Sequence, residues 1–261
     1  MGAKNGQPLK SGSVKKPHRI IFAHTIMKKI LKKILSPFFY RFHTRDVGVK
    51  MEIKFWEKWL CQRDGKWKDD FAYRISPDSL VMGFHKEIID SIGLAEVNVL
   101  DVGAGPMTAI GKRHPGKKII ITATDPLADD YNLMLDKHKI VPPVRTVSVS
   151  AEELASIYCG KKFDWINAQN SLDHAVDPIS VIEGISALLS NNGVLSLFHE
   201  INEGLEEGYR GFHKWNFVPC DNGFAVWNPQ RKEIFKNGDK GLIISTKTIE
   251  GNLLCMIKIS S

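Results

Sequence analysis

The chain has 261 residues, of which 43% are hydrophobic, and it carries a formal net charge of +7. This length and composition suffice for one sizeable α/β core. No apolar run reaches the roughly 18 residues that a membrane-spanning helix needs. The four cysteines are scattered and form no CxxC pair, which argues against a structural zinc site or a redox pair. A reducing, cytoplasmic environment is therefore expected.

The positive charge is concentrated at the N-terminus. Residues 1–50 hold twelve Lys and Arg but a single acid, Asp46, so the rest of the chain is net acidic. Segment 1–19 is rich in Gly, Ser and Lys and is predicted to be a disordered basic arm. Segment 20–45 is predicted to contain a basic amphipathic helix, because pairs of apolar residues alternate with pairs of lysines every four residues.

This predicted helix has two interpretations. A lysine face opposite an apolar face, with aromatic residues behind it, suits an anionic membrane surface. Residues 20–40 are therefore expected to attach the protein peripherally to the inner face of the membrane. Alternatively, the apolar face packs against the body of the protein. Regular lysines offer charge without base recognition, so no specific nucleic-acid binding is expected.

Residues 46–95 are predicted to form a helical lead-in to the main domain. Aromatic and apolar residues at helical spacing predict an amphipathic helix over 52–61. Residues 71–77 are predicted to be extended or to form a turn, because the residue before Pro77 avoids the helical region.

A glycine turn between two apolar strands is the strongest signal. The strand over 97–101 leads into Gly103 and Gly105, where the missing Cβ lets the backbone turn sharply and approach a ligand. A second strand over 118–124 ends at Asp125, 20 residues after Gly105. This spacing suits an acid at the tip of the neighbouring strand that binds a ribose diol. The alternative is a tight turn beside a solvated acid.

The ligand predicted for this turn is not a dinucleotide. The dinucleotide fingerprint requires a third glycine, and Thr108 stands at that position. Pro106 also follows Gly105 directly. A nicotinamide-dependent dehydrogenase is therefore the weaker alternative.

Further strands complete the predicted sheet. They are expected over 142–149, 163–168 and 194–198, with a C-terminal hairpin over 242–249 and 253–259. Two polar segments, Gln169–Pro178 and His199–Phe217, follow predicted strands, and no hydrophobic period explains the second. Because ligands bind outside the carboxyl ends of parallel strands, both segments are expected at the ligand crevice.

The segments Leu100–Pro106 and Thr124–Leu127 resemble motifs I and II of class I S-adenosylmethionine-dependent methyltransferases. More specifically, the chain is similar to a group of bacterial methyltransferase-like proteins that share the segments found here at Asn170–Pro178 and Asn202–Phe217. The resemblance covers roughly residues 50–261. It implies an α/β, Rossmann-like sheet of seven mostly parallel strands, with an antiparallel last strand and helices on both faces.

The resemblance also implies S-adenosyl-L-methionine as the cofactor and a catalytic domain over 96–261. Glu152 is the expected adenine contact, and the alternative is that Ser150 and Glu153 cap the following helix. The residues expected to bind the cofactor are Asp101, Gly103, Gly105, Pro106, Asp125, Pro126, Leu127, Glu152 and Asn170.

A histidine after the fifth strand is well placed to deprotonate an acceptor hydroxyl, because its ordinary pKa lies near neutrality. His199 and His213 are the main candidates and His174 is a further one; the alternative is a histidine that binds substrate without proton transfer. No metal is expected, since a site from His199, Glu203 and His213 would have irregular spacing. The residues expected near the acceptor are Trp56, Tyr73, Arg74, Glu200, Asn202, Glu203, Tyr209 and Trp215.

Together these expectations predict a methyltransferase that O-methylates a polyhydroxylated small molecule, sugar or glycan near the membrane. A lipid or isoprenoid acceptor is the rival among enzymes. A methyltransferase-fold module that binds or regulates without catalysis is the rival outside them.

Overall fold

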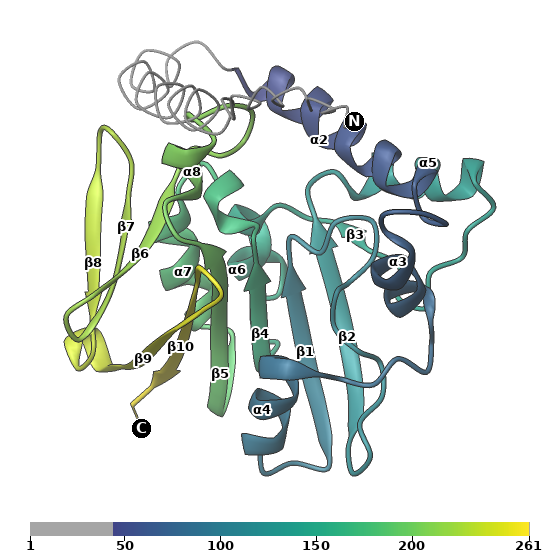
Figure 1. Ribbon diagram of the computed structural model, residues 1–261. Coiled ribbons are helices and arrows are strands. Elements are labelled where there is room, and N and C mark those ends of the chain that lie inside the picture. The colour runs from purple at the N-terminus through teal and green to yellow at the C-terminus, as the bar shows by residue number, and fades with distance from the viewer. Residues whose placement is uncertain (1–43, 261) are drawn as a thin grey trace, which may run out of the picture.

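The computed structural model describes residues 44–260 (Figure 1). The predicted basic arm over 1–19 lies outside this range, as does nearly all of the predicted amphipathic helix over 20–45. Membrane attachment of that segment therefore stays a prediction. Among residues 44–260, every helix is too short or too polar to cross a bilayer.

A seven-stranded sheet in the order β3-β2-β1-β4-β5-β10-β9 forms the centre of the molecule. Its strands are β1 (Glu96–Val102), β2 (Lys118–Asp125), β3 (Val147–Ser148), β4 (Phe163–Gln169), β5 (Leu189–Glu200), β9 (Leu242–Ile249) and β10 (Asn252–Ile259). β10 is antiparallel to both of its neighbours, whereas the pairings among β1 to β5 are parallel. This confirms the predicted class I methyltransferase sheet with one antiparallel strand.

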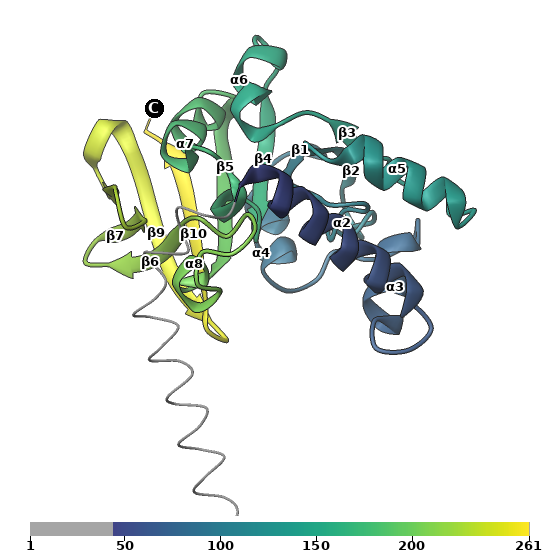
Figure 2. The same cartoon turned by 90° about the horizontal axis from the view of Figure 1, so that it is seen from above.

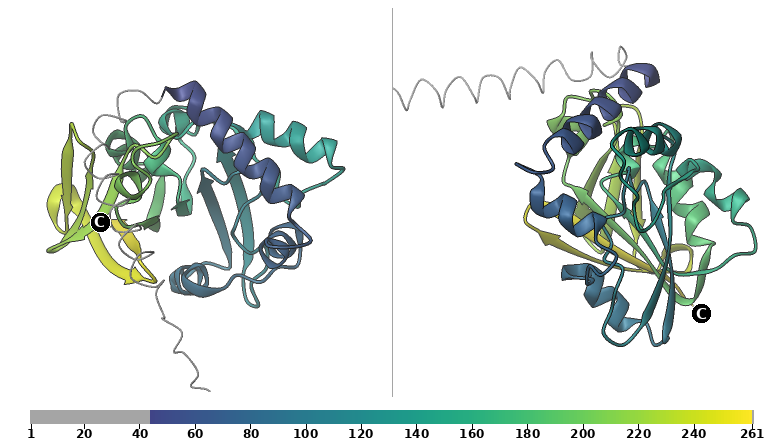
Figure 3. Two further views of the ribbon diagram at one scale, coloured as in Figure 1. Left: turned by 45° about the horizontal axis from the view of Figure 1, so that its top comes forward. Right: turned by 90° about the vertical axis from the view of Figure 1, so that its right-hand side faces the viewer.

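Helices cover both faces of this sheet and the edge where its parallel strands end (Figures 1 and 3). The helices of four or more residues are α2 (Arg45–Cys61), α3 (Lys68–Ile75), α4 (Gly83–Ser91), α5 (Ala128–Lys137), α6 (Leu154–Ile157), α7 (Pro178–Ser186) and α8 (Glu203–Glu206). Seen from above, α2 crosses the strand ends between α8 and α3 (Figure 2). It thereby forms a roof over the edge where a ligand site is expected.

The alternation of side chains along β1 determines where two of these helices pack. Val97 and Val99 face one side, where they join a buried cluster with Ile88 of α4. Leu100 faces the other side and joins a buried cluster with Ile182 of α7. Because the strand is buried on both faces, apolar side chains occur on both sides of it, at Val99 and at Leu100.

A second, three-stranded antiparallel sheet stands beside the main one. It consists of β6 (Asn216–Cys220), β7 (Gly223–Trp227) and β8 (Lys232–Lys236), in that order. Phe217 and Phe224 of this sheet belong to the same buried cluster as α7. The small sheet therefore extends the main core.

Two local predictions were wrong. Residues 71–77 are not extended, because α3 continues to Ile75 and only Ser76, directly before Pro77, adopts an extended conformation. The strand predicted over 142–149 is reduced to the two residues of β3.

Candidate active site

A cavity of about 650 Å³ opens at the carboxyl ends of β1, β2 and β4. Its lining includes Gly103 and Gly105 after β1, Asp125 at the end of β2, and Asn170 after β4. Trp56 on α2 contributes to the roof. This volume lies in the range of small-molecule and cofactor sites.

The glycine turn has the shape that the sequence predicts. Gly103 and Gly105 have φ angles of +70° and +64°, which an L side chain rarely adopts. A Cβ on Gly103 would lie 2.3 Å from the Cβ of Ser171, and one on Gly105 would lie 2.7 Å from the Trp56 ring. Both neighbours therefore approach the backbone more closely than any other residue type would allow.

Asp125 is fastened to this turn by backbone hydrogen bonds. Gly105 N–H donates to one of its carboxylate oxygens at 3.1 Å, and Leu127 N–H donates to the other at 2.9 Å. Burial raises the pKa of Asp125 to about 6, although these two hydrogen bonds act in the opposite direction. Pro126 and Leu127 also line the cavity, whereas Pro106 is buried outside it.

Asp101 belongs to a buried polar network that the sequence analysis missed. Asn167 of β4 donates to one Asp101 oxygen at 2.9 Å, and Thr108 donates to the other at 2.6 Å. Asn167 in turn accepts a hydrogen bond from Ser196 of β5 at 2.9 Å. The only sequence signal was the polar Asn167 between the apolar residues Ile166 and Ala168 of β4.

The roof of the cavity is aromatic and is tied together locally. Trp56 donates its indole N–H to Glu52 at 2.8 Å and packs edge-on against Trp59 and Tyr131. Arg74 lies 5.7 Å from the Trp56 ring and also lines the cavity. Glu52 was not among the predicted residues, although it lies on the predicted helix one turn before Trp56.

Glu152, the predicted adenine contact, lies at the cavity but already has a backbone hydrogen-bond partner. Glu152 lines the cavity, and its carboxylate accepts a hydrogen bond from Val176 N–H at 2.8 Å. The predicted capping by Ser150 and Glu153 is confirmed, because the Ser150 N–H and hydroxyl both donate to the Glu153 carboxylate. Asn170 lines the cavity with a left-handed backbone, φ +46°, and accepts a hydrogen bond from Glu200 N–H.

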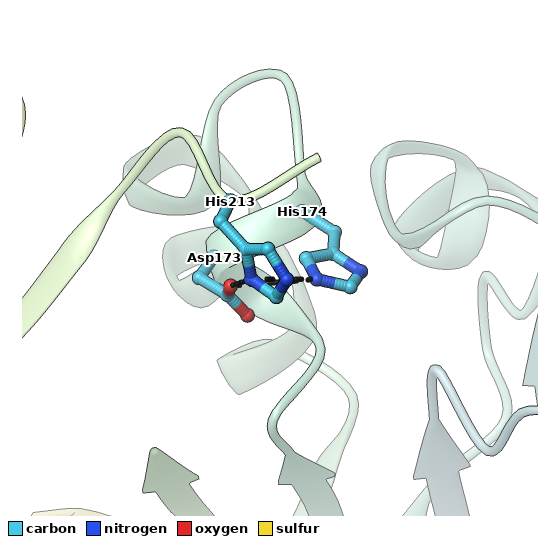
Figure 4. Close-up of side chains that lie close together, drawn as sticks. All are labelled: Asp173, His174 and His213. Carbon is cyan, nitrogen blue, oxygen red and sulfur yellow. Dashed lines mark hydrogen bonds and ion pairs between the residues drawn. The ribbon is translucent and has the colours of Figure 1, made fainter. Parts of the chain in front are cut away.

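The far end of the cavity holds a cluster of a carboxylate and two imidazoles (Figure 4). His213 Nδ1 lies 2.7 Å from Asp173 Oδ2, and His174 Nε2 lies 3.4 Å from the same oxygen. Burial alone would lower the pKa of His213, but Asp173 outweighs it and raises that pKa. Burial together with the charge of Asp173 also raises the pKa of Glu203, 3.5 Å from His213.

His199 does not line the cavity, contrary to the expectation that it faces the acceptor. It is 1% exposed and stacks on Phe217 with ring centroids 4.2 Å apart. Burial lowers its pKa to about 4. The alternation of β5 explains this placement, because it turns Glu200 toward the cavity and His199 away from it.

Of the residues expected near the acceptor, four lie outside the cavity lining. Tyr73 donates its hydroxyl to Leu80 O at 2.8 Å, and Trp215 donates its indole N–H to Ala175 O at 3.1 Å. Tyr209 is buried against Asn216, and Asn202 occupies the turn before α8. Tyr209 and Trp215 therefore anchor the segment between β5 and β6. Glu200 and Glu203, by contrast, line the cavity.

The cavity is strongly acidic. Its acidic residues are Glu52, Asp101, Asp125, Glu152, Glu200, Glu203, Glu206 and Glu207. Arg45 and Arg74 are the arginines of the lining. The site therefore favours a ligand that carries positive charge.

The strand order, with β10 antiparallel to its neighbours, is that of a Rossmann-like class I methyltransferase fold. The chain is 33% identical over 136 residues to the ubiquinone biosynthesis O-methyltransferase of Histophilus somni (strain 2336), an alignment that covers 48% of this chain and 51% of that protein. The chain thus spans about half the length of the curated relative it matches. No protein-family model matches the chain.

Solved structures show a likeness in the fold alone. An S-adenosylmethionine-dependent methyltransferase from Clostridium acetobutylicum has 14% identity and a TM-score of 0.45, covering 79% of this chain and 99% of that one. An O-methyltransferase family protein from Burkholderia thailandensis has 16% identity and a TM-score of 0.44, covering 67% of this chain and 55% of that one.

Proposed function

We propose that the protein is an S-adenosylmethionine-dependent O-methyltransferase whose acceptor is a neutral hydroxyl compound, such as a sugar or glycan. The observation that carries the proposal is the junction of Gly105 and Asp125, which presents a buried carboxylate to the cavity beside a backbone that only glycine can form. Oxygen as the methylated atom is supported by the name of the Histophilus somni relative.

The residues of the cavity fit this cofactor. Asp125 keeps free lone pairs on an oriented carboxylate, which suits the two hydroxyls of a ribose. Gly103, Gly105 and Asn170 all line the cavity, and the amino-acid part of the cofactor would lie against them. Glu152 lies where it can meet the adenine amino group. When bound, the cofactor supplies a methyl group on a positively charged sulfur.

The charge of the cavity supports both the cofactor and the kind of acceptor. The lining holds eight acidic residues and two arginines, and although burial raises the pKa of Asp125 and Glu203, the remaining carboxylates still outnumber the cations, so a sulfonium is attracted. A phosphate or carboxylate on the acceptor would be repelled by the same groups. A neutral polyhydroxylated acceptor is therefore favoured over a phosphorylated lipid or a nucleic acid.

The histidine cluster provides what an acceptor hydroxyl needs. His174 and His213 line the cavity at the end away from Asp125, and the buried Asp173 fixes their orientation. Imidazole nitrogens there can hold the hydroxyl and receive its proton as the oxygen becomes nucleophilic. Glu200 and Glu203 can accept hydrogen bonds from further hydroxyls of a sugar.

A two-stage experiment tests this proposal. Calorimetry first measures the affinity of the full-length protein for S-adenosylmethionine, with Asp125→Asn as the matched variant. Methyl transfer from labelled cofactor is then measured on neutral sugars and glycans, on their phosphorylated counterparts, and on isoprenoid and phenolic acceptors. Turnover of neutral polyhydroxylated acceptors is the expected result.

Other results would overturn defined parts of the proposal. Turnover confined to isoprenoids or phenols would replace the sugar as the acceptor. Cofactor binding without turnover of any class would favour a binding module. Failure of the wild-type protein to bind the cofactor would overturn the proposal as a whole.

A further inference from the structure

Three potential ligand atoms converge on one point at the acceptor end of the cavity (Figure 4). Asp173 Oδ2 lies 2.7 Å from His213 Nδ1 and 3.4 Å from His174 Nε2, and the two nitrogens lie 3.1 Å apart. Donor atoms of one zinc ion, each about 2.0–2.2 Å from the metal, are roughly 3.0–3.5 Å apart. The spacing of this cluster is close to that of a ligand set.

Hydrogen bonds alone satisfy this arrangement poorly. If His213 Nδ1 donates its proton to Asp173, no proton is left to point from it toward His174 Nε2. If His174 Nε2 also carries a proton, that proton can reach Asp173 Oδ2 only across 3.4 Å, and the two nitrogens then lie 3.1 Å apart with no hydrogen bond between them. A cation at the point of convergence would satisfy all three atoms at once, because each would direct a lone pair at it.

The surroundings of the cluster supply further donors and a rigid base. Glu203 Oε1 lies 3.5 Å from His213 Nδ1, and Glu203 Oε2 is buried without a hydrogen-bond partner among the described residues. Asp173 is 1% exposed, and its backbone carbonyl accepts a hydrogen bond from Lys214 N–H at 3.0 Å. This bond ties the segment after β4 to the segment that carries His213.

We propose that Asp173, His174 and His213 bind one divalent transition-metal ion, with Glu203 as a fourth ligand. Two imidazoles with carboxylates are a donor set for zinc, manganese or iron, whereas magnesium and calcium prefer oxygen ligands alone. This assignment replaces the expectation that the protein holds no metal, and also the irregular site of His199, Glu203 and His213 considered from the sequence. His199 stands behind Asp173, 3.8 Å away, on the side away from the cavity.

The role of this ion rests on the proposed function, but it replaces His174 and His213 as proton acceptors, because their lone pairs would be directed at the metal. The acceptor hydroxyl would bind the metal and lose its proton more readily, because the positive charge stabilises the alkoxide. The proton leaves to solvent. The alkoxide oxygen then forms a bond to the methyl carbon as the carbon–sulfur bond breaks, and that electron pair remains on sulfur. The products are a methyl ether and a neutral thioether.

The test uses the full-length protein after treatment with a chelator. Zn²⁺, Mn²⁺ and Mg²⁺ are titrated separately by calorimetry, and Co²⁺ is added as a spectroscopic probe of imidazole and carboxylate ligation. One site per chain for Zn²⁺, with much weaker binding of Mg²⁺, is the expected result. His213→Ala and Asp173→Asn should each weaken Zn²⁺ binding at least about tenfold.

His138→Ala, a change at the C-terminal end of α5, is the matched control and should leave Zn²⁺ affinity unchanged. Circular dichroism excludes unfolding, and His174→Gln gives a second, milder ligand variant. Unaltered Zn²⁺ affinity in the folded His213→Ala and His174→Gln proteins would overturn the metal site. Cofactor affinity measured on the same samples separates this failure from failure of the proposed function, because the Asp125 end of the cavity contributes no ligand.

Discussion

The backbone N–H of Gly105 and the carboxylate of Asp125, 3.1 Å apart, join the ends of two neighbouring strands into one binding surface. The bond exists because Gly105 adopts a left-handed conformation that turns its N–H toward β2. Leu127 N–H fixes the second oxygen at 2.9 Å, so the carboxylate is oriented before any ligand arrives. Such preorganisation would lower the cost of binding the ribose of the proposed cofactor.

Removal of the Asp125 charge should weaken cofactor binding. Asp125→Asn is expected to lower the affinity for S-adenosylmethionine at least about tenfold, because hydrogen bonds to a charged group contribute roughly 1.5–3 kcal/mol. Calorimetry measures the effect. Asp129→Asn, an exposed acid in the first turn of α5, is the control and should bind as the wild type does. Equal affinities for all three proteins would contradict the site.

The raised pKa of Asp125, about 6, predicts opposite pH trends for binding and stability. Cofactor affinity should rise as pH increases through 6, because the ionised carboxylate is the better acceptor. Between its ordinary pKa near 3.8 and about 6, the folded state holds a proton that the unfolded state has lost. The contribution of Asp125 to the free energy of unfolding therefore falls as pH rises through this window.

Thermal melts of the unliganded wild type and of Asp125→Asn, taken from pH 4 to pH 7, isolate this contribution. The difference between the two melting temperatures should change in favour of Asp125→Asn as pH rises. A constant difference over the window would show that Asp125 titrates at its ordinary pKa.

The glycine turn should tolerate no side chain at Gly103. Gly103→Ala is expected to destabilise the protein by about 2 kcal/mol or more, since alanine is disfavoured at positive φ and its Cβ would lie 2.3 Å from that of Ser171. Gly116→Ala, where a Cβ meets nothing within 4 Å, is the matched control and should lie within about 0.5 kcal/mol of wild type. Urea denaturation measures both.

The buried network around Asp101 should matter for stability as well as for binding. Asn167→Ala removes the amide that donates to Asp101 and accepts from the Ser196 hydroxyl. Each buried polar group left without a partner costs about 1–3 kcal/mol. A lower midpoint of denaturation and weaker cofactor binding are expected together. Asn191→Ala, an exposed change at the start of β5, should alter neither. Wild-type stability of Asn167→Ala would show that the network is dispensable.

Sequence patterns predicted the strands and the glycine turn beside Asp125 well. The strands β1, β2 and β4, the glycine turn and Asp125 each follow from local properties: runs of apolar residues, positions that need positive φ, and the spacing between them. Gly105 and Asp125 are only 20 positions apart, and each strand is recognised from its own residues, so none of these predictions requires knowledge of distant pairing.

The sequence by itself thus determined the class I sheet and the acid at the tip of β2, because strand formation and tight turns depend on neighbouring residues. Only the tertiary structure decided the acceptor end. Asp173 and His213 are 40 positions apart and meet through the fold of the loop before β6. The alternation of β5 buries His199, and the packing of that loop buries Tyr209 and Trp215. Long-range packing decides which polar residues reach a cavity. Residue types and their spacing along the chain do not reveal that packing.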